Sequence, residues 1–327
     1  MKIKKEKLFI IISAVILLLT AFFSLRYGSA KLTLAEFFSA FKGNNTSSVI
    51  VFQLRLPRLL AGILSGIALS VAGTIIQALT DNDMASPSIV GVNSGAGLMV
   101  IFFVAFINVS AYFLPVFAFI GAFLASLFIT ALSRKMGLTK SSIILTGLAI
   151  NAVFSAGISF ISLIDESALV SYHAFSVGSL SLITYGDILV PSIIIVTGVI
   201  LALLISKDLT IIRMGDTVAG SLGVRVKRVK VTGIIITSML SASAVSICGL
   251  LGFVGLIAPH LAKLFVGGNL KKLIPASALT GSILVTLSDF LGKIIFAPSD
   301  LPVGIIMALI GAPFFLILLV KGGAKNA

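Results

Sequence analysis

The stretch LLAGILSGIALSVAGTIIQAL, residues Leu59–Leu79, decides the fold class of this chain. It contains no charged residue, and its length matches the roughly 20 apolar residues that a helix needs to cross the hydrocarbon core of a bilayer. We therefore predict a membrane-spanning helix over these residues.

The composition extends this prediction to the whole chain of 327 residues. Apolar residues make up 58% of it and charged residues only 11%, whereas soluble domains contain about 45–50% and about 25% respectively. The mean hydropathy is +1.19. We predict an all-α integral membrane protein in which residues 1–327 form a single polytopic domain.

Further apolar stretches lie on both sides of the first one. They predict spans at Leu8–Leu25, Ser88–Ile107, Tyr112–Leu132, Ser142–Ile164, Ile188–Ser206, Val231–Leu251, Ile274–Leu291 and Val303–Val320. The first of these follows several lysines, as the core of a signal peptide would, but its length and the later spans favour a retained helix. Glycines within the spans indicate either close helix packing or simply the glycine-rich composition of membrane helices.

A tenth candidate, Gly252–Val266, is short and is interrupted by Pro259. Because lipid cannot satisfy free backbone N–H and C=O groups, we expect this segment to lie inside the bundle. Charge counting favours its crossing. With ten crossings, 18 of the 24 Lys and Arg residues are cytoplasmic and six are external, namely Arg26, Lys31, Lys42, Arg55, Arg58 and Lys293. Such a split follows the positive-inside rule and places both termini in the cytoplasm.

Three connections exceed a minimal turn. The external connection at residues 26–58 has a turn-like middle, Gly43–Ser48, and the external connection at residues 165–187 has room for a short helix around Ser167–Val177. The cytoplasmic connection, residues 207–230, contains MGDTVAGSLGV at Met214–Val224. From composition alone, this last segment is equally consistent with a short helix that a partner grips and with a solvated loop.

The chain lacks the residue patterns of catalysis. It has no phosphate-binding GxxxxGK[ST] loop, and its two histidines, His173 and His260, have no cysteine or carboxylate at ligand spacing. We expect no catalytic residue, no metal site and no cofactor. Asp289 is the one acidic residue well inside a span, either as a functional group or as a structural partner of Lys293 or of a neighbouring helix. A proton-coupled carrier would normally show several, so energy is expected from a partner.

Five motifs resemble the FecCD-type permease subunits of ABC importers for iron–siderophores, haem and cobalamin. They are RLPRLLAGILSGIALSVAGTIIQAL (Arg55–Leu79), SPSIVGVNSGAG (Ser86–Gly97), GDTVAGSLGV (Gly215–Val224), GFVGLIAPHLAKLFVG (Gly252–Gly267) and LPVGIIMALIGAPFF (Leu301–Phe315). The resemblance implies the type II importer architecture, with ten transmembrane helices per subunit in the cytoplasmic membrane. It also implies ATP-binding cassette ATPase subunits, an extracytoplasmic substrate-binding protein or lipoprotein, and a second permease subunit as partners, with no nucleic acid.

The resemblance also implies roles for particular residues. Docking of the binding protein falls to Arg55, Arg58 and Lys293, the last a lysine where the family usually has arginine. Coupling to the ATPase falls to Gly215, Asp216, Ala219, Ser221, Leu222 and Gly223, and a cytoplasmic gate falls to Lys140, Ser141 and Ser142. Lys140 departs from the Ser and Thr that are usual in the family at this gate.

The leading hypothesis is therefore a permease that moves an iron(III)–siderophore complex by alternating access. A first alternative keeps the family and changes the cargo to haem or cobalamin. A second alternative is an ion- or proton-coupled carrier that works without an ATPase. A membrane-embedded enzyme is disfavoured, because the chain offers no nucleophile–base pair or metal cluster.

Overall fold

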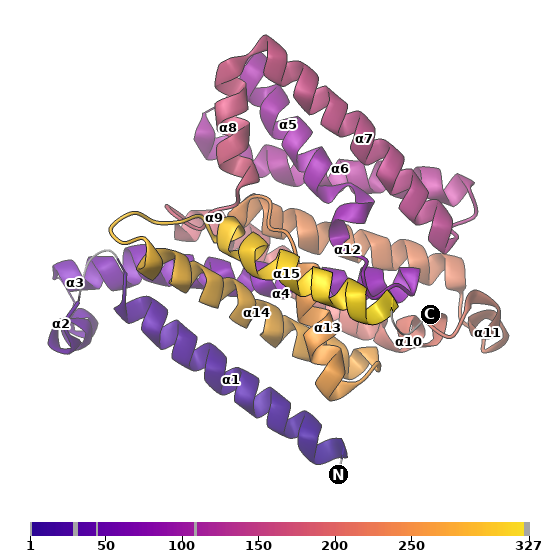
Figure 1. Cartoon of the computed structure of the whole chain (residues 1–327), viewed down its shortest axis with the longest axis horizontal. Helices are drawn as coiled ribbons and strands as arrows, with labels where there is room; N and C mark the ends of the chain where they lie inside the picture. The colour runs from indigo at the N-terminus through magenta and orange to yellow at the C-terminus, as the bar shows by residue number, and fades with distance from the viewer. Residues whose placement is uncertain (1, 29–31, 44, 108–109, 324–327) are drawn as a thin grey trace.

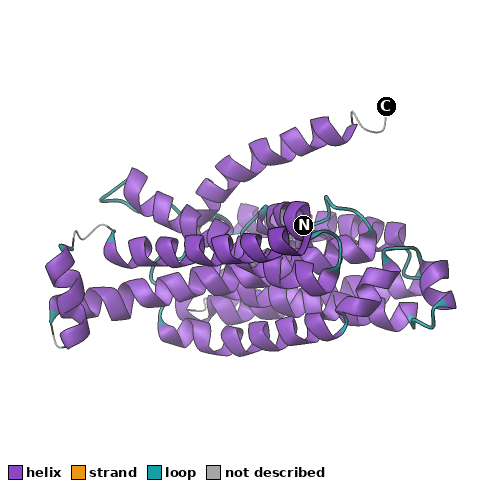
Figure 2. Cartoon of the chain, turned by 90° about the horizontal axis from the view of Figure 1, so that it is seen from below, coloured by secondary structure: helices purple, strands orange, loops and turns teal. Residues whose placement is uncertain are grey.

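The computed structural model describes residues 2–28, 32–43, 45–107 and 110–323. Lys31 and Lys325, which entered the charge count, and Asn44 of the turn-like segment lie outside the described residues. Figure 2 shows that the described part of the chain consists of helices joined by loops, without strands. The all-α prediction is confirmed.

Each of the ten apolar stretches forms a helix. They are α1 (Lys2–Arg26), α4 (Leu56–Thr80), α5 (Val92–Ile107), α6 (Leu114–Lys135), α7 (Lys140–Ile164), α9 (Tyr185–Leu204), α12 (Val226–Cys248), α13 (Val254–Val266), α14 (Leu270–Ile295) and α15 (Val303–Gly323). Among the described residues, seven helices are long and apolar enough to cross a membrane, and α5, α13 and α15 contribute shorter apolar stretches.

Short helices occupy the connections. The helix expected around Ser167–Val177 is α8 (Glu166–Ser176), and the segment left open between helix and loop forms α11 (Asp216–Ser221), directly after an unpredicted α10 (Ser206–Ile212). The external connection is more helical than expected, with α2 at Leu34–Ser39 and α3 at Thr46–Ser48. A π-helical stretch, Val49–Arg55, then joins α3 to α4 without a break.

The side chain of Asn45 caps the helix α3, and this cap explains why Thr46–Ser48, predicted as part of a turn-like segment, are helical. Gly43 does adopt a positive φ of 80°, but the Asn45 side chain already accepts a hydrogen bond from the Ser48 amide at 2.8 Å. Asparagine is a favoured N-cap residue. The helix therefore begins at Thr46, 13 residues before the predicted span begins at Leu59.

The centre of the bundle is α4, which packs against α14, α12, α13 and α9 (Figure 1). Two glycine pairs bring backbones together: a Cβ on Gly66 would lie 2.4 Å from the carbonyl oxygen of Gly281 on α14, and one on Gly73 would lie 1.8 Å from that of Gly255 on α13. Such distances exclude any side chain at these crossings. Of the two readings of the span glycines, close packing holds at these positions.

The first half of the proline-interrupted helix α13 lies inside the bundle. This half, Val254–Pro259, is buried and contacts α4 and α14. Pro259 removes a backbone donor and kinks a helix interior, so the surrounding protein, and not lipid, must shelter this segment. The expected position inside the bundle is confirmed for this half, whereas Leu264 and Phe265 at its end are exposed.

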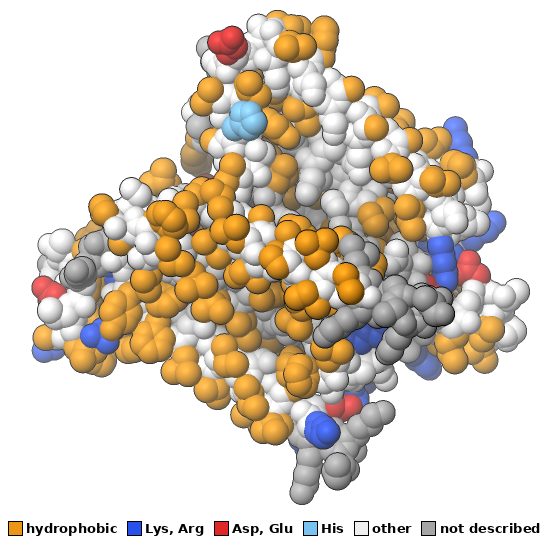
Figure 3. Space-filling model, in the orientation of Figure 1, with side chains coloured by type: hydrophobic (Ala, Val, Ile, Leu, Met, Phe, Trp, Pro, Cys, Tyr) orange, Lys and Arg blue, Asp and Glu red, His pale blue; other side chains and the backbone are white. Residues whose placement is uncertain are grey.

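The surface has the character of a lipid-facing one. Figure 3 shows apolar side chains over much of the visible face, and large exposed hydrophobic side chains occur along α1, α7, α9 and α15. In Figure 1, the start of α1 and the end of α15 lie toward α11, on the side away from α2 and α3. The molecule thus has two distinct ends, which we call the α3 end and the α11 end.

Candidate functional site

At the α3 end, four charged side chains from α4, α14 and the α14–α15 loop form one cluster. Arg58 donates through Nε to the two Asp289 oxygens at 3.0 and 3.2 Å, and it also pairs with Asp300. Lys293, one helical turn after Asp289, places its Nζ 2.6 Å from Asp289 Oδ2. We call these four residues the Asp289 cluster.

The Asp289 cluster is largely removed from water, and its charges balance. The side chains of Asp289 and Lys293 are only 3% and 5% exposed, and that of Arg58 is 12% exposed. Removing charges from water is costly unless they are paired and hydrogen-bonded, and here two cations face two carboxylates. Both structural alternatives for Asp289 occur together, because it binds Lys293 on its own helix and Arg58 on α4.

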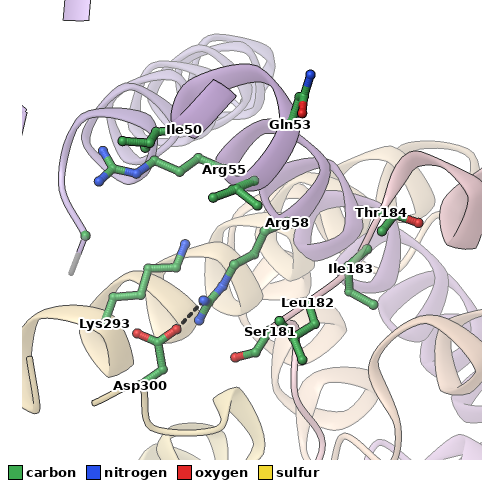
Figure 4. Close-up of a pocket in the computed structure, with 12 residues that line it drawn as sticks. Ile50, Gln53, Arg55, Arg58, Ser181, Leu182, Ile183, Thr184, Lys293 and Asp300 are labelled. Atoms are coloured by element: carbon green, nitrogen blue, oxygen red, sulfur yellow. Dashed lines mark hydrogen bonds and ion pairs between the residues drawn. The ribbon is translucent and has the colours of Figure 1, made fainter. Parts of the chain in front are cut away.

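The three residues predicted to dock a binding protein surround a single cavity of about 470 Å³. Arg55 is buried, and its Nη1 donates to the backbone oxygens of Leu25 and Arg26 at 2.9 and 2.6 Å. In Figure 4, its guanidinium points away from that of Arg58, which extends toward Asp300. The structure thus brings Arg55, Arg58 and Lys293 together but holds all three against partners within the chain.

At the α11 end, the predicted coupling residues form a compact projection. Gly215 and Gly223, with φ of 113° and 82°, stand directly before α11 and two residues after its end. Glycine adopts positive φ at little cost, so these two residues set the sharp bends of the projection. Asp216 and Ser221 are exposed, and Leu222 is 62% exposed.

One predicted contact residue is corrected by the structure. Ala219 has no exposed surface, so it lies on the side of α11 that faces the rest of the protein. It is therefore not part of the exposed surface of α11. Met214 and Val218, which the sequence reading passed over, are 69% and 43% exposed. With Leu222 they give the projection an apolar face.

The helix α7 begins with the predicted gate residues Lys140, Ser141 and Ser142. The Thr139 hydroxyl caps the helix by accepting a hydrogen bond from the Ser142 amide at 3.0 Å, and Ser142 is buried while Ser141 is exposed. Lys140 Nζ lies 2.9 Å from Asp81 Oδ2, at the end of α4. The gate segment is therefore tied to the α4–α5 loop by the residue that departs from the usual Ser and Thr.

Several residues with evident structural roles at these ends were missed. The sequence analysis assigned no role to Asp81, Asp83 or Asp300, and it counted Lys230 only among the cytoplasmic positive charges. No local pattern marks them, because each finds its partner on a distant segment. Among the residues that the structure describes, no group of three metal-ligating side chains comes together.

A helical bundle with an apolar belt, a charged cavity at one end and an exposed apolar projection at the other has the features of a membrane transporter subunit. Comparison with known proteins makes this specific, because the model of the FecCD transport family matches residues 16–321. The chain belongs to the FecCD transport family. It is thus a multi-pass permease subunit of a cell-membrane ABC importer, not the catalytic subunit, and this confirms the family predicted from the sequence.

Individual relatives cover nearly the whole chain or most of it. The iron(3+)-hydroxamate import permease FhuG of Bacillus subtilis is 34% identical, over 98% of this chain and 99% of its own. The hemin transport permease HmuU of Yersinia pestis is 36% identical over 83% of each. A solved structure classed as a metal-chelate type ABC transporter, in an inward-facing conformation, aligns with a TM-score of 0.84 at 27% identity, over 95% of this chain and 98% of its own.

Proposed function

We propose that this chain is the permease subunit of an importer that moves an iron(III)–siderophore complex across the cytoplasmic membrane by alternating access. The observation that carries the transport role is the family match over residues 16–321. The cargo is supported by relatives such as FhuG, whose name gives iron(3+)-hydroxamate as its cargo. The chain itself does no covalent chemistry and serves as the conduit.

We also propose ten crossings with both termini in the cytoplasm, as in type II importers. The 18-to-6 split of Lys and Arg supports this orientation through the positive-inside rule. The start of α1 and the end of α15 both lie on the side of the molecule away from α2 and α3, and this supports it too (Figure 1). On this reading the α11 end is cytoplasmic and the α3 end is external.

At the cytoplasmic side, α11 is proposed to seat in an ATP-binding cassette ATPase subunit. Its apolar face of Met214, Val218 and Leu222 is exposed and lies beyond the membrane-spanning helices, where lipid does not cover it. Exposed apolar groups that cluster in this way are typical of protein interaction sites. A second permease subunit, identical or paralogous, would complete the transport pathway.

At the external side, Arg55, Arg58 and Lys293 are proposed to receive acidic residues of an extracytoplasmic binding protein or lipoprotein. Because each cation already has partners in this chain, docking would require an incoming carboxylate to compete with them. We expect Arg55→Glu plus Arg58→Glu to abolish docking while assembly with the ATPase persists. Unchanged docking affinity at moderate salt would refute this assignment.

Haem is the second candidate cargo, because the hemin permease HmuU is 36% identical to this chain. Cobalamin stays open as a third, since the family resemblance includes it. An ion-coupled carrier is disfavoured by the structure, because Asp289, the acid within a span, is neutralised by Arg58 and Lys293. A coupled carrier needs an acid that can bind and release its ion.

The deciding experiment is growth under iron starvation of a strain that lacks this gene, supplied with single siderophores, haem or cobalamin. Loss of growth on one siderophore, restored by the intact gene, would establish the proposed cargo. A gene that carries Leu222→Asp should fail to restore growth, because the change places a charge on the exposed apolar face of α11 without disturbing the core. Normal growth on every siderophore, with loss on haem alone, would overturn the siderophore assignment.

A further inference from the structure

Lys230, in the first turns of α12, is among the largest fully buried side chains of the described protein, with 1% of its side chain exposed. Its Nζ lies 2.6 Å from Asp216 Oδ2 at the start of α11 and donates to the backbone oxygen of Leu138 at 3.0 Å. One ammonium group therefore joins the proposed coupling helix to the loop that leads into the proposed gate.

The two halves of the ion pair are unequal in burial. The Asp216 side chain is 48% exposed, whereas Lys230 is almost completely enclosed. A buried ammonium is tolerated only when it is paired and hydrogen-bonded, so Lys230 needs the carboxylate that α11 brings to it. Displacement of α11 from its seat would leave Lys230 with the Leu138 carbonyl alone, and the contact between the three segments would not survive unchanged.

The loop that receives Lys230 has a constrained backbone. Gly137 and Leu138 both have positive φ, 89° and 54°, a conformation that is uncommon for leucine. Leu138 is buried, and its amide closes the end of α6 by donating to the Ser133 oxygen at 2.9 Å. The next residue, Thr139, caps α7. Whatever holds the Leu138 carbonyl in place therefore also fixes where α7 begins.

Other ion pairs surround this contact but are more exposed. Lys140 meets Asp81 with both side chains about two-fifths exposed, and Asp83 receives Lys263 and Arg213 at 2.5 and 3.6 Å. Exposed pairs contribute little because water and salt screen them. Among these contacts, Lys230 is the one cation that is almost completely enclosed, with 1% of its side chain exposed, and its link is therefore the one suited to carry a displacement from α11 to α7.

We propose that Lys230 is a positioning residue that transmits movement of α11 to the start of α7. When the ATPase displaces α11, Asp216 leaves Lys230, and an ammonium that has lost its carboxylate does not stay buried beside the Leu138 carbonyl alone. The hold on that carbonyl is then released, and the segment from Thr139 to Ser142 is free to move. This inference rests on the proposed coupling role of α11. It adds to that role a specific path, from Asp216 through Lys230 to Leu138.

The first test is hydrogen exchange on the purified full-length permease. Asp216→Asn removes a carboxylate that does not touch the gate loop, yet it should accelerate exchange of residues 137–142, as Lys230→Met should. In the double variant the two effects should not add, because both changes break the same path. Lys135→Met, an exposed lysine three residues before Leu138, should leave exchange there unchanged. If Asp216→Asn leaves the exchange of residues 137–142 at the wild-type rate, the proposal is wrong.

The second test separates transmission from a structural role by measuring uptake and ATP hydrolysis in the assembled importer. We expect Lys230→Met to lower uptake about tenfold, a size typical of coupling between sites, while hydrolysis continues. Lys230→Arg, which keeps a buried donor and charge, should restore uptake in large part. Equal loss of uptake and hydrolysis, or uptake as in the wild type, would overturn the proposal. Should Lys230→Met fail to accumulate, the Asp216→Asn result decides the matter.

A failure of this inference can be told from a failure of the proposed function. If Leu222→Asp leaves uptake normal, α11 is not the coupling element, and the coupling assignment made under the proposed function is wrong. If Leu222→Asp uncouples hydrolysis from uptake while Lys230→Met and Asp216→Asn do not, only the path through Lys230 is refuted.

Discussion

Replacing Asp289 by asparagine tests how much the ion pairs of the Asp289 cluster contribute to the stability of the protein. The substitution keeps the shape of the side chain. Among the described residues, it removes the one carboxylate that is in direct contact with Lys293. Breaking a buried ion pair from one side costs about 3–5 kcal/mol. Arg58 keeps Asp300 as a partner, so we expect the lower end of this range. The free energy of unfolding should fall by about 3 kcal/mol, which is roughly a hundredfold in the folding equilibrium.

The assay is reversible unfolding of the purified permease in mixed micelles with a denaturing detergent. The double variant Asp289→Asn plus Lys293→Met should recover most of the loss, because no buried ammonium is then left unpaired. Glu166→Gln makes the same chemical change at an exposed position and should stay within about 0.5 kcal/mol of the wild type. A single variant as stable as Glu166→Gln, or a double variant no better than the single, would refute the reasoning.

Two further predictions concern packing and pH. Gly73→Ala would place a Cβ 1.8 Å from the Gly255 oxygen, and it should lower the free energy of unfolding by about 1–3 kcal/mol in the same assay. Gly220→Ala, with open space around its Cβ, should leave that free energy unchanged. Equal stabilities of the two variants would contradict the close packing at Gly73. Hydrogen bonds from the Ser167 side chain and from the Ala168 backbone hold the pKa of Asp165 below its ordinary value. The cap on α8 is therefore fully present above the ordinary pKa and is lost as the pH falls through the lowered pKa. Protection of the Ser167 amide should therefore drop in acid, and in Asp165→Asn it should not vary with pH; the same acid response in both proteins would count against the cap.

The positions of the helices follow from the sequence because hydropathy is a local property. A run of about 20 apolar residues must form a helix in lipid to satisfy its own backbone groups, and Leu59–Leu79 became the centre of α4 within a few residues at each end. The placement of Gly252–Val266 against protein followed in the same way from Pro259. The family was also readable, since its motifs are contiguous in the sequence.

The external connection shows where local reasoning failed. Turn-forming residues around Gly43 suggested an irregular segment, yet Asn45 caps a helix that continues through Val49–Arg55 into α4. The same residue types favour both turns and helix N-caps. Composition alone does not distinguish them, because the outcome depends on whether the apolar residues that follow find a surface to pack against.

The sequence by itself determined that this is a helical membrane permease and which segments form its helices. Only the tertiary structure decided which charges meet. Arg58 and Asp289 are 231 residues apart in the chain, Lys230 and Leu138 are 92 apart, and Gly73 meets Gly255 across two helices. Burial and pairing are properties of neighbouring helices, so a lysine that counts as one more cytoplasmic charge in the sequence becomes, in the fold, the enclosed link between α11 and α7.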